Sequence, residues 1–302
     1  MTTLLAPAGS PEAVQAALEA GADHVYVGLK GWSRGGARGE LDWRELADVV
    51  VRAQARGAEV QVALNTIPKP RERAELFAHV PRVAALGIRT LIVNDLGILA
   101  ALHRRFPELR LTASIGCGAQ SDADVAFFAE IGAAAVVLPG TVGPAEAAVC
   151  AAVPGITVEI MLHMVEEFVL LGKCWMPSYV HLRPTALPGG MPDAMRQTGS
   201  MKRGGVGACF RICQEPWELT ADGGRREHPR FPSRQLSRVG DVAEYVAAGV
   251  GVLKLQGRSL PPEPLGSLVR RYRQALDAAR TGDPVPEGPE AALPPSWTVL
   301  GR

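Results

Sequence analysis

The sequence predicts an α/β protein that folds as a closed (β/α)8 barrel, and two observations favour this class. First, five Ala-rich amphipathic runs each end at a glycine, and a β-branched run begins within a few residues; the glycines are Gly21, Gly57, Gly87, Gly132 and Gly249. A glycine just past a helix can adopt the left-handed conformation that closes the last turn, so each is predicted to mark a helix end. Second, apolar strands that alternate with helices require parallel pairing, and eight such units fit a closed barrel better than the alternative, an open doubly wound sheet.

The eight predicted strands are short apolar segments. In chain order they cover residues 3–6, 24–28, 59–65, 90–94, 110–115, 134–138, 157–162 and 252–255. The intervening segments have helical periodicity, with apolar stripes over residues 46–53 and 265–276. Ser10 is a good N-cap before Pro11, which suits the first helical position, and Asp95 is predicted to cap the helix after the fourth strand.

One connection is far longer than the two to six residues that are usual between a strand and a helix. It separates the seventh strand, which is expected to end near His163, from a helix expected over residues 239–248. We therefore expect one barrel domain over residues 1–281, an insertion at 164–238 after strand 7, and a Pro- and Gly-rich tail at 282–302.

Composition and charge exclude several classes of protein. With 47% hydrophobic and 21% charged residues, the 302-residue chain can build a large core and is not disordered. The formal net charge is +1, so no global field attracts nucleic acid or an anionic membrane, and any RNA contact must be local. No segment reaches the ~18 apolar residues of a membrane span. The sequence thus predicts a cytoplasmic protein without membrane association.

The five cysteines are too few for a disulfide scaffold, and an odd number fits a reducing compartment. Cys174, Cys209 and Cys213 fall within the insertion, which a barrel would place at its ligand-binding mouth. Thiolates on an irregular segment suit a soft metal or an iron-sulfur cluster. The alternative is that these cysteines are small buried hydrophobic residues. Cys150, in an Ala-rich helix, is assigned to packing.

Seven motifs that occur in order carry a resemblance to a known family. They read Leu-Leu-Ala-Pro-Ala-Gly-Ser-Pro from residue 4, Ala-Gly-Ala-Asp-His-Val-Tyr-Val-Gly-Leu-Lys from 20, Leu-Asn-Thr from 64, Leu-His from 162, Gly-Lys-Cys from 172, Gly-Ala-Cys-Phe-Arg-Ile-Cys from 207 and Leu-Lys-Leu-Gln-Gly-Arg from 253. From residue 4 to about 280 the chain resembles the collagenase-like peptidase U32 family. The resemblance implies an iron-sulfur protein that hydroxylates an aromatic or pyrimidine ring without molecular oxygen, on a quinone precursor or a base of transfer or ribosomal RNA.

The resemblance also implies a 4Fe-4S cluster and its ligands. Cys174, Cys209 and Cys213 match three of the four family cysteines, and Glu167 stands at the position of the first. Either the Glu167 carboxylate completes the site, or the fourth iron is open to water or substrate. Zinc, held by the three thiolates with Glu167 or His163, is the alternative metal.

Cys117 is not expected to supply the missing thiolate. If Ser114 faces into the barrel, strand alternation turns Cys117 toward the helices. Gly116 and Gly118 replace polar side chains of similar proteins, which predicts a pocket for a different or bulkier ligand.

Three further residues are expected at the site. His163 could be a donor to the cluster, a ligand or a general acid and base, with a structural role as the alternative. Lys254 and Arg258 flank the end of the last strand and are expected to position an anionic substrate group, with a surface salt bridge as the alternative. Asn65 and Asn94 end strands and could orient a substrate or cap a helix.

The sequence therefore predicts a redox enzyme, with two alternatives. One is a metal-dependent peptidase, although the sequence from His163 to Glu167 lacks the second histidine of zinc-peptidase motifs. The other is a non-catalytic partner of an active paralogue, which would have lost the first cysteine and an acid at Gln256. The expected substrate is an RNA base or a small aromatic metabolite.

Overall fold

In the computed structural model, eight parallel strands close into a barrel. The structure describes residues 1–33, 39–166, 217–221, 224–228 and 234–285. The barrel strands follow one another around the wall in chain order, and the last pairs with the first. They are β1 (Thr3–Pro7), β2 (His24–Gly28), β3 (Glu59–Leu64), β4 (Thr90–Val93), β5 (Arg110–Ala113), β6 (Ala135–Pro139), β7 (Thr157–Glu166) and β11 (Val252–Leu255). The predicted (β/α)8 barrel is confirmed, because the last strand, β11, pairs with the first, β1, whereas an open sheet would have two free edges.

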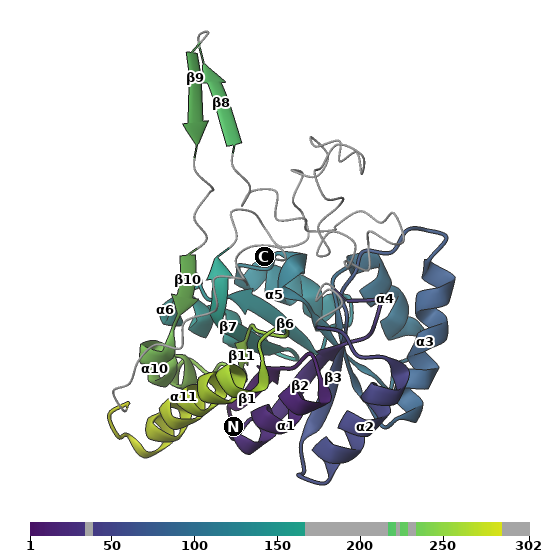
Figure 1. Ribbon diagram of the computed structural model, residues 1–302, viewed down its shortest axis with the longest axis horizontal. Helices are drawn as coiled ribbons and strands as arrows, with labels where there is room; N and C mark the ends of the chain where they lie inside the picture. Colours follow the sequence, from purple (N-terminus) through teal and green to yellow (C-terminus); the bar gives the residue numbers. More distant parts are fainter. Residues whose placement is uncertain (34–38, 167–216, 222–223, 229–233, 286–302) are drawn as a thin grey trace.

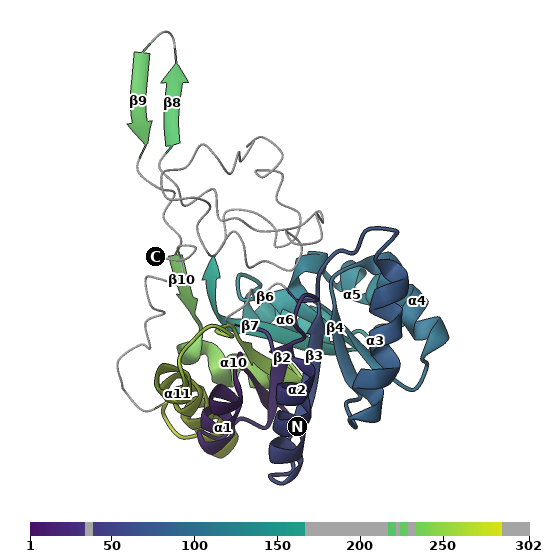
Figure 2. The same ribbon diagram turned by 45° about the vertical axis from the view of Figure 1, so that its right-hand side comes forward.

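Helices surround this barrel, as Figures 1 and 2 show. They are α1 (Pro11–Glu19), α2 (Trp43–Gln54), α3 (Arg73–Ala85), α4 (Leu96–Arg105), α5 (Asp122–Glu130), α6 (Pro144–Ala151), α10 (Val242–Ala247) and α11 (Pro262–Thr281), with the short 3-10 helices η1 (Ile115–Cys117) and η3 (Val239–Asp241). All five predicted helix-stop glycines have φ between +70° and +96°, the left-handed region expected of them. The Ser10 hydroxyl accepts from the Ala13 amide at 3.1 Å, and Asp95 accepts from the Ile98 amide at 2.8 Å, so both predicted caps are confirmed.

The chain leaves and rejoins the barrel differently from the prediction. β7 continues to Glu166, and β10 (Arg234–Ser237) pairs with it antiparallel, with Ser237 opposite His163. The ends of the predicted insertion are therefore hydrogen-bonded to each other beside the barrel wall. β8 (Trp217–Ala221) and β9 (Gly224–His228) form a separate antiparallel pair. Because β7 and β10 pair, the segment between Glu166 and Arg234 begins and ends at the carboxyl ends of the barrel strands.

Apolar side chains form two layers. A large cluster fills the space between strands and helices, and it includes Cys117 and Cys150. Inside the barrel, one small cluster comes from Leu5, Tyr26, Ala63 and Ile92, and another from Val137, Met161 and Met164 with Ile115 and Leu236 packed against it. The inner clusters identify the strand positions that face the lumen, and alternation along each strand assigns its other residues, except in β7 beyond Met161, where the register with β11 shifts.

Candidate functional site at the barrel mouth

An ion pair lies inside the barrel. The Lys254 ammonium of β11 is 2.7 Å from a carboxylate oxygen of Glu159 on β7, and the two side chains are only 3% and 2% exposed. The hydroxyl of Thr112 is 3.4 Å from the other carboxylate oxygen. The structure thus places the charge of Lys254 against a buried carboxylate instead of in the open mouth, which reduces what this ammonium can contribute to binding an anion.

Arg258, just beyond β11, contacts the loop after β2. Its guanidinium donates to the Ser33 hydroxyl at 2.8 Å, and this hydroxyl donates to the buried Glu40 carboxylate at 3.1 Å. The Gly31 amide also donates to Glu40, at 2.9 Å. Burial raises the pKa of Glu40, and the hydrogen bonds from Gly31 and Ser33 oppose that shift. This network holds Arg258 across the mouth, where a guanidinium can bind a carboxylate or phosphate through two hydrogen bonds.

The space for this network depends on Gly28 at the end of β2. A Cβ at this position would lie 2.2 Å from the Ser33 hydroxyl and 2.5 Å from the Arg258 guanidinium. Any larger residue would therefore separate Arg258 from Ser33.

Tyr26 connects the two cations. Its hydroxyl donates to the Leu255 carbonyl at 2.8 Å. The Lys254 ammonium and the Arg258 guanidinium lie 5.0 and 5.9 Å from the centre of its ring, within the range of cation–π attraction. Burial raises the pKa of Tyr26 well above its usual value, so this side chain stays neutral.

His163 lies on the outer side of the barrel wall. It pairs with Leu255, which belongs to the cluster between strands and helices, and its ring is 5.8 Å from that of Tyr272 on α11. The side chain is 1% exposed, and within the described residues neither ring nitrogen has a hydrogen-bond partner. Burial lowers the pKa of His163 to about 4, so the imidazole is neutral at pH 7. This placement favours the structural alternative over an acid–base role at the mouth.

Asn94 follows β4 and faces the lumen, since Ile92 two residues earlier belongs to an inner cluster. It does not cap α4, which Asp95 does. A Cβ at Gly116 would lie 2.0 Å from the Asn94 amide oxygen. The space that the sequence predicted to be empty at Gly116 is therefore occupied by this carboxamide, and the expectation of an emptied pocket is wrong at that position.

The predicted cluster ligands Glu167, Cys174, Cys209 and Cys213 lie outside the described residues. Within the described part of the chain, no group of three or more His, Cys, Asp and Glu side chains could hold a metal ion. The Cys117 thiol donates to the Val93 carbonyl at 3.5 Å, in the layer between strands and helices, as alternation predicted. Cys150 is buried in the same layer, and burial raises the pKa of its thiol.

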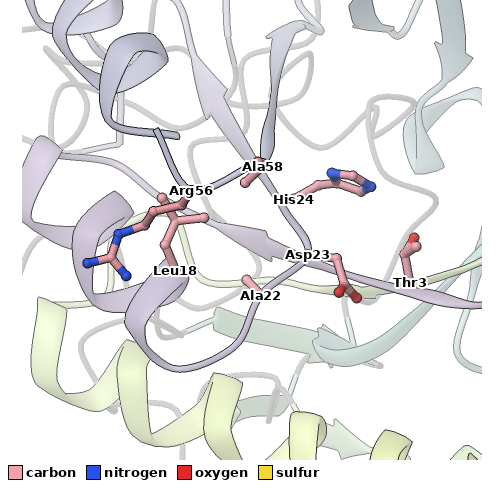
Figure 3. A pocket seen from close by; sticks show the side chains of 8 residues that line it. Thr3, Leu18, Ala22, Asp23, His24, Arg56 and Ala58 are labelled. Atoms are coloured by element: carbon pink, nitrogen blue, oxygen red, sulfur yellow. The ribbon is translucent and has the colours of Figure 1, made fainter. Parts of the chain in front are cut away.

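A hollow of 460 Å³ lies at the amino-terminal end of the barrel, opposite the mouth (Figure 3). Two of the charged side chains that line it, Asp23 and Arg56, already have partners. Asp23 accepts from the Leu4 amide at 2.7 Å and from Arg273 at 3.1 Å, while Arg56 pairs with Glu19. Barrels of this type carry their ligand sites at the other end, so this hollow is not the candidate site.

Sequence reasoning missed Glu159, Ser33 and Glu40. Glu159 could have been found, because it is a charged residue within an otherwise apolar predicted strand. Lys254 is a residue of opposite charge in the same situation, and two such buried charges are expected to pair. Ser33 and Glu40 lie in a connection with no periodic pattern, and nothing local marks them as partners of Arg258.

The chain is therefore a (β/α)8 protein in which Arg258 and the buried amide of Asn94 lie at the carboxyl ends of the strands, the end at which barrels of this class bind ligands, while the Lys254–Glu159 ion pair lies deeper in the barrel. Residues 9–292 match the model of peptidase family U32, and the chain belongs to this family. A solved structure titled "The Structure of the U32 Peptidase Mk0906" aligns with a TM-score of 0.54 and 12% identity over 86% of this chain and 95% of that one. At this identity the likeness shows the shared fold alone.

The curated relatives differ in their names. The 23S rRNA 5-hydroxycytidine C2501 synthase of Escherichia coli (strain K12) is 26% identical, over 91% of this chain but only 39% of its own length. The tRNA hydroxylation protein P of the same organism is 25% identical, over 93% of this chain and 69% of its own. A protein named collagenase, from Porphyromonas gingivalis, is 23% identical over 92% of this chain and 66% of its own. Among the described residues, no helix is both long and apolar enough to cross a membrane.

Proposed function

We propose that this protein takes part in the hydroxylation of a pyrimidine base in RNA. The observation that carries the proposal is the membership of the chain in a family whose relatives include an rRNA 5-hydroxycytidine synthase and tRNA hydroxylation proteins, each similar over more than nine-tenths of this chain. The net charge of +1 fits an enzyme that binds RNA through local contacts, such as those of Arg258, and not through a general positive charge.

We further propose that the protein holds a 4Fe-4S cluster through Cys174, Cys209 and Cys213, with Glu167 or an exogenous group as the fourth ligand. Thiolates are the usual ligands of such clusters, and a carboxylate oxygen can also bind iron, so the donor types fit. The pairing of β7 with β10 supports this position, since the segment that carries these residues starts and ends at the mouth. A bound cluster would supply the electron transfer that ring hydroxylation requires.

Within this proposal the described residues bind and orient. Arg258, held by Ser33, would bind a phosphate of the RNA through paired hydrogen bonds. The Lys254–Glu159 pair and Tyr26 would form the neutral floor below the base.

The cluster is tested by anaerobic purification and analysis of iron, sulfide and zinc. We expect about four irons and four sulfides per chain in the wild type, and loss of both in Cys209→Ala. Cys150→Ala is the matched control, because this buried thiol packs in α6 and should leave the cluster intact. Stoichiometric zinc instead of iron would overturn the cluster and favour a hydrolytic protein. A cluster retained by Glu167→Ala would identify an exogenous fourth ligand.

The reaction is tested by expressing the chain in a bacterium that lacks its own tRNA and rRNA hydroxylation proteins, and analysing RNA nucleosides by mass spectrometry. We expect a pyrimidine nucleoside heavier by one oxygen atom, present with the wild type and Cys150→Ala and absent with Cys209→Ala. Unmodified RNA in every strain, with an intact cluster, would contradict the proposed function.

A further inference from the structure

Asn94 is a buried polar side chain without a partner. It is 4% exposed, and within the described part of the chain neither its amide nitrogen nor its amide oxygen has a hydrogen-bond partner. Leaving a buried polar group unpaired costs about 1–3 kcal/mol, and native proteins keep few such groups. Among the described residues, no hydrogen-bond partner of Asn94 offsets that cost.

The backbone around Asn94 holds its carboxamide in the mouth. Asn94 lies at the carboxyl end of β4 and faces the lumen, and the backbone of η1 stands beside it at Gly116. With a Cβ at position 116 only 2.0 Å from the amide oxygen, only glycine leaves the carboxamide where it is. Two elements therefore combine to keep an amide with free hydrogen-bonding capacity at the site.

An apolar surface adjoins this amide. Ile115, next to Gly116, packs against the inner cluster of Val137, Met161 and Met164. Ile115 is only partly buried, whereas Val137, Met161 and Met164 are at most 5% exposed behind it. A flat ring would therefore contact Ile115 and direct one polar edge at Asn94, the combination of apolar wall and few polar groups that is typical of small-ligand sites.

The chemistry of the amide selects the kind of ligand. A carboxamide offers one acceptor and a donor side by side and carries no charge, so it matches a neutral edge on which a donor and an acceptor are adjacent. Cytosine (N4–H and N3) and uracil (N3–H and O4) both have such an edge, whereas an anion would meet the amide oxygen unfavourably. The ammonium of Lys254 is meanwhile neutralised by Glu159.

We infer that Asn94 binds the Watson–Crick edge of a pyrimidine base, through one donated and one accepted hydrogen bond, with the ring against Ile115. Enzymes that modify a base in RNA or DNA commonly read an extruded base in this way, by its edge and its faces. The inference deepens the proposed function and rests on it for the choice of RNA as the source of the base.

The test measures binding of cytidine and uridine to the anaerobically purified full chain by saturation-transfer NMR, with N4,N4-dimethylcytidine and 3-methyluridine as neutral probes whose edge is blocked. We expect the wild type to bind cytidine or uridine and to bind the methylated form about tenfold more weakly or worse. Asn94→Leu and Gly116→Ala should lose binding by a similar factor. Gln61→Leu is the matched control, since this amide is similarly buried but lies on β3 opposite Thr90, deeper in the barrel than Asn94.

Stability separates a binding role from a structural one. Asn94→Leu removes an unpaired buried amide and breaks no hydrogen bond of the described structure, so its melting temperature should equal or exceed that of the wild type. Asn94→Asp keeps the shape but replaces the donor, and it should also bind more weakly. Wild-type binding by Asn94→Leu, a lower melting temperature of that variant, or no binding of either nucleoside to the wild type would overturn the inference.

The nucleoside-binding experiment and the RNA assay can give independent results, so the two proposals are tested separately. Nucleoside binding that depends on Asn94, in a protein that modifies no RNA, would support the base site and contradict the proposed reaction. RNA hydroxylation that is unchanged in Asn94→Leu would support the reaction and overturn the base site.

Discussion

The buried ion pair between Lys254 and Glu159 allows a quantitative test of the barrel interior. The Glu159 carboxylate is 2% exposed, and among the described residues Lys254→Met would leave its side chain only the long contact of 3.4 Å with Thr112. Removing one partner of a buried pair costs about 3–5 kcal/mol, because it leaves an uncompensated charge. For a domain of this size each kcal/mol lowers the melting temperature by about 2–4 °C, so we expect a decrease of roughly 10 °C.

The second substitution should reverse most of this loss. Lys254→Met combined with Glu159→Leu replaces the pair with apolar groups of similar volume, and such replacements are neutral or stabilising by up to about 4 kcal/mol. Arg52→Met is the control, since its ion pair with Asp48 is exposed on α2 and should contribute about 0.5 kcal/mol at most.

Urea unfolding at pH 7, followed by circular dichroism, gives the free energy of unfolding of the wild type, Lys254→Met, the double variant and Arg52→Met. A double variant as unstable as Lys254→Met would refute the reasoning, because the loss would then arise from packing and not from the unpaired charge. If Lys254→Met lowers the free energy of unfolding by less than about 1 kcal/mol, the reasoning is refuted as well, because water or another group would then reach the Glu159 carboxylate.

Three further predictions concern other residues. The unfolding free energy of the wild type should fall by up to about 3 kcal/mol as the pH drops from 6.5 to 4, because the unfolded chain takes up a proton that buried His163 (pKa about 4) does not; urea midpoints across this range should be flatter for His163→Leu, and equal slopes would contradict the burial effect. Ser121→Ala should lower the unfolding free energy by about 1 kcal/mol, since its hydroxyl caps α5 at the Asp124 amide (3.2 Å); an unchanged urea midpoint would show that the cap contributes nothing. Gly28→Ala should separate Arg258 from its hydroxyl partner and reduce RNA modification at least tenfold, at a cost of about 1–3 kcal/mol in stability, whereas wild-type modification would exclude Arg258 from substrate binding.

Local rules explain why the strands and helix ends could be predicted. A helix-stop glycine or an N-cap such as Ser10 depends on its chain neighbours within one turn, and those neighbours are in the sequence. The count of eight strands then restricted the fold to a few topologies.

His163 shows where local rules stop. Strict alternation from Met161, which faces the lumen, would also turn His163 inward. Instead the register between β7 and β11 shifts by one residue, so Leu162 and His163 both stand opposite Leu255 and both face the helices. A bulge depends on the pairing strand, and no pattern within β7 announces it.

The sequence by itself determined the repeating strand–helix units, the residues that end them and the family to which they belong, because these depend on short-range periodicity and on ordered motifs. Only the tertiary structure decided that Lys254 meets Glu159, that Arg258 reaches Ser33, and that Asn94 occupies the space beside Gly116. These partners lie many residues apart in the chain, and the pairing of neighbouring strands and the closure of the barrel set their distances.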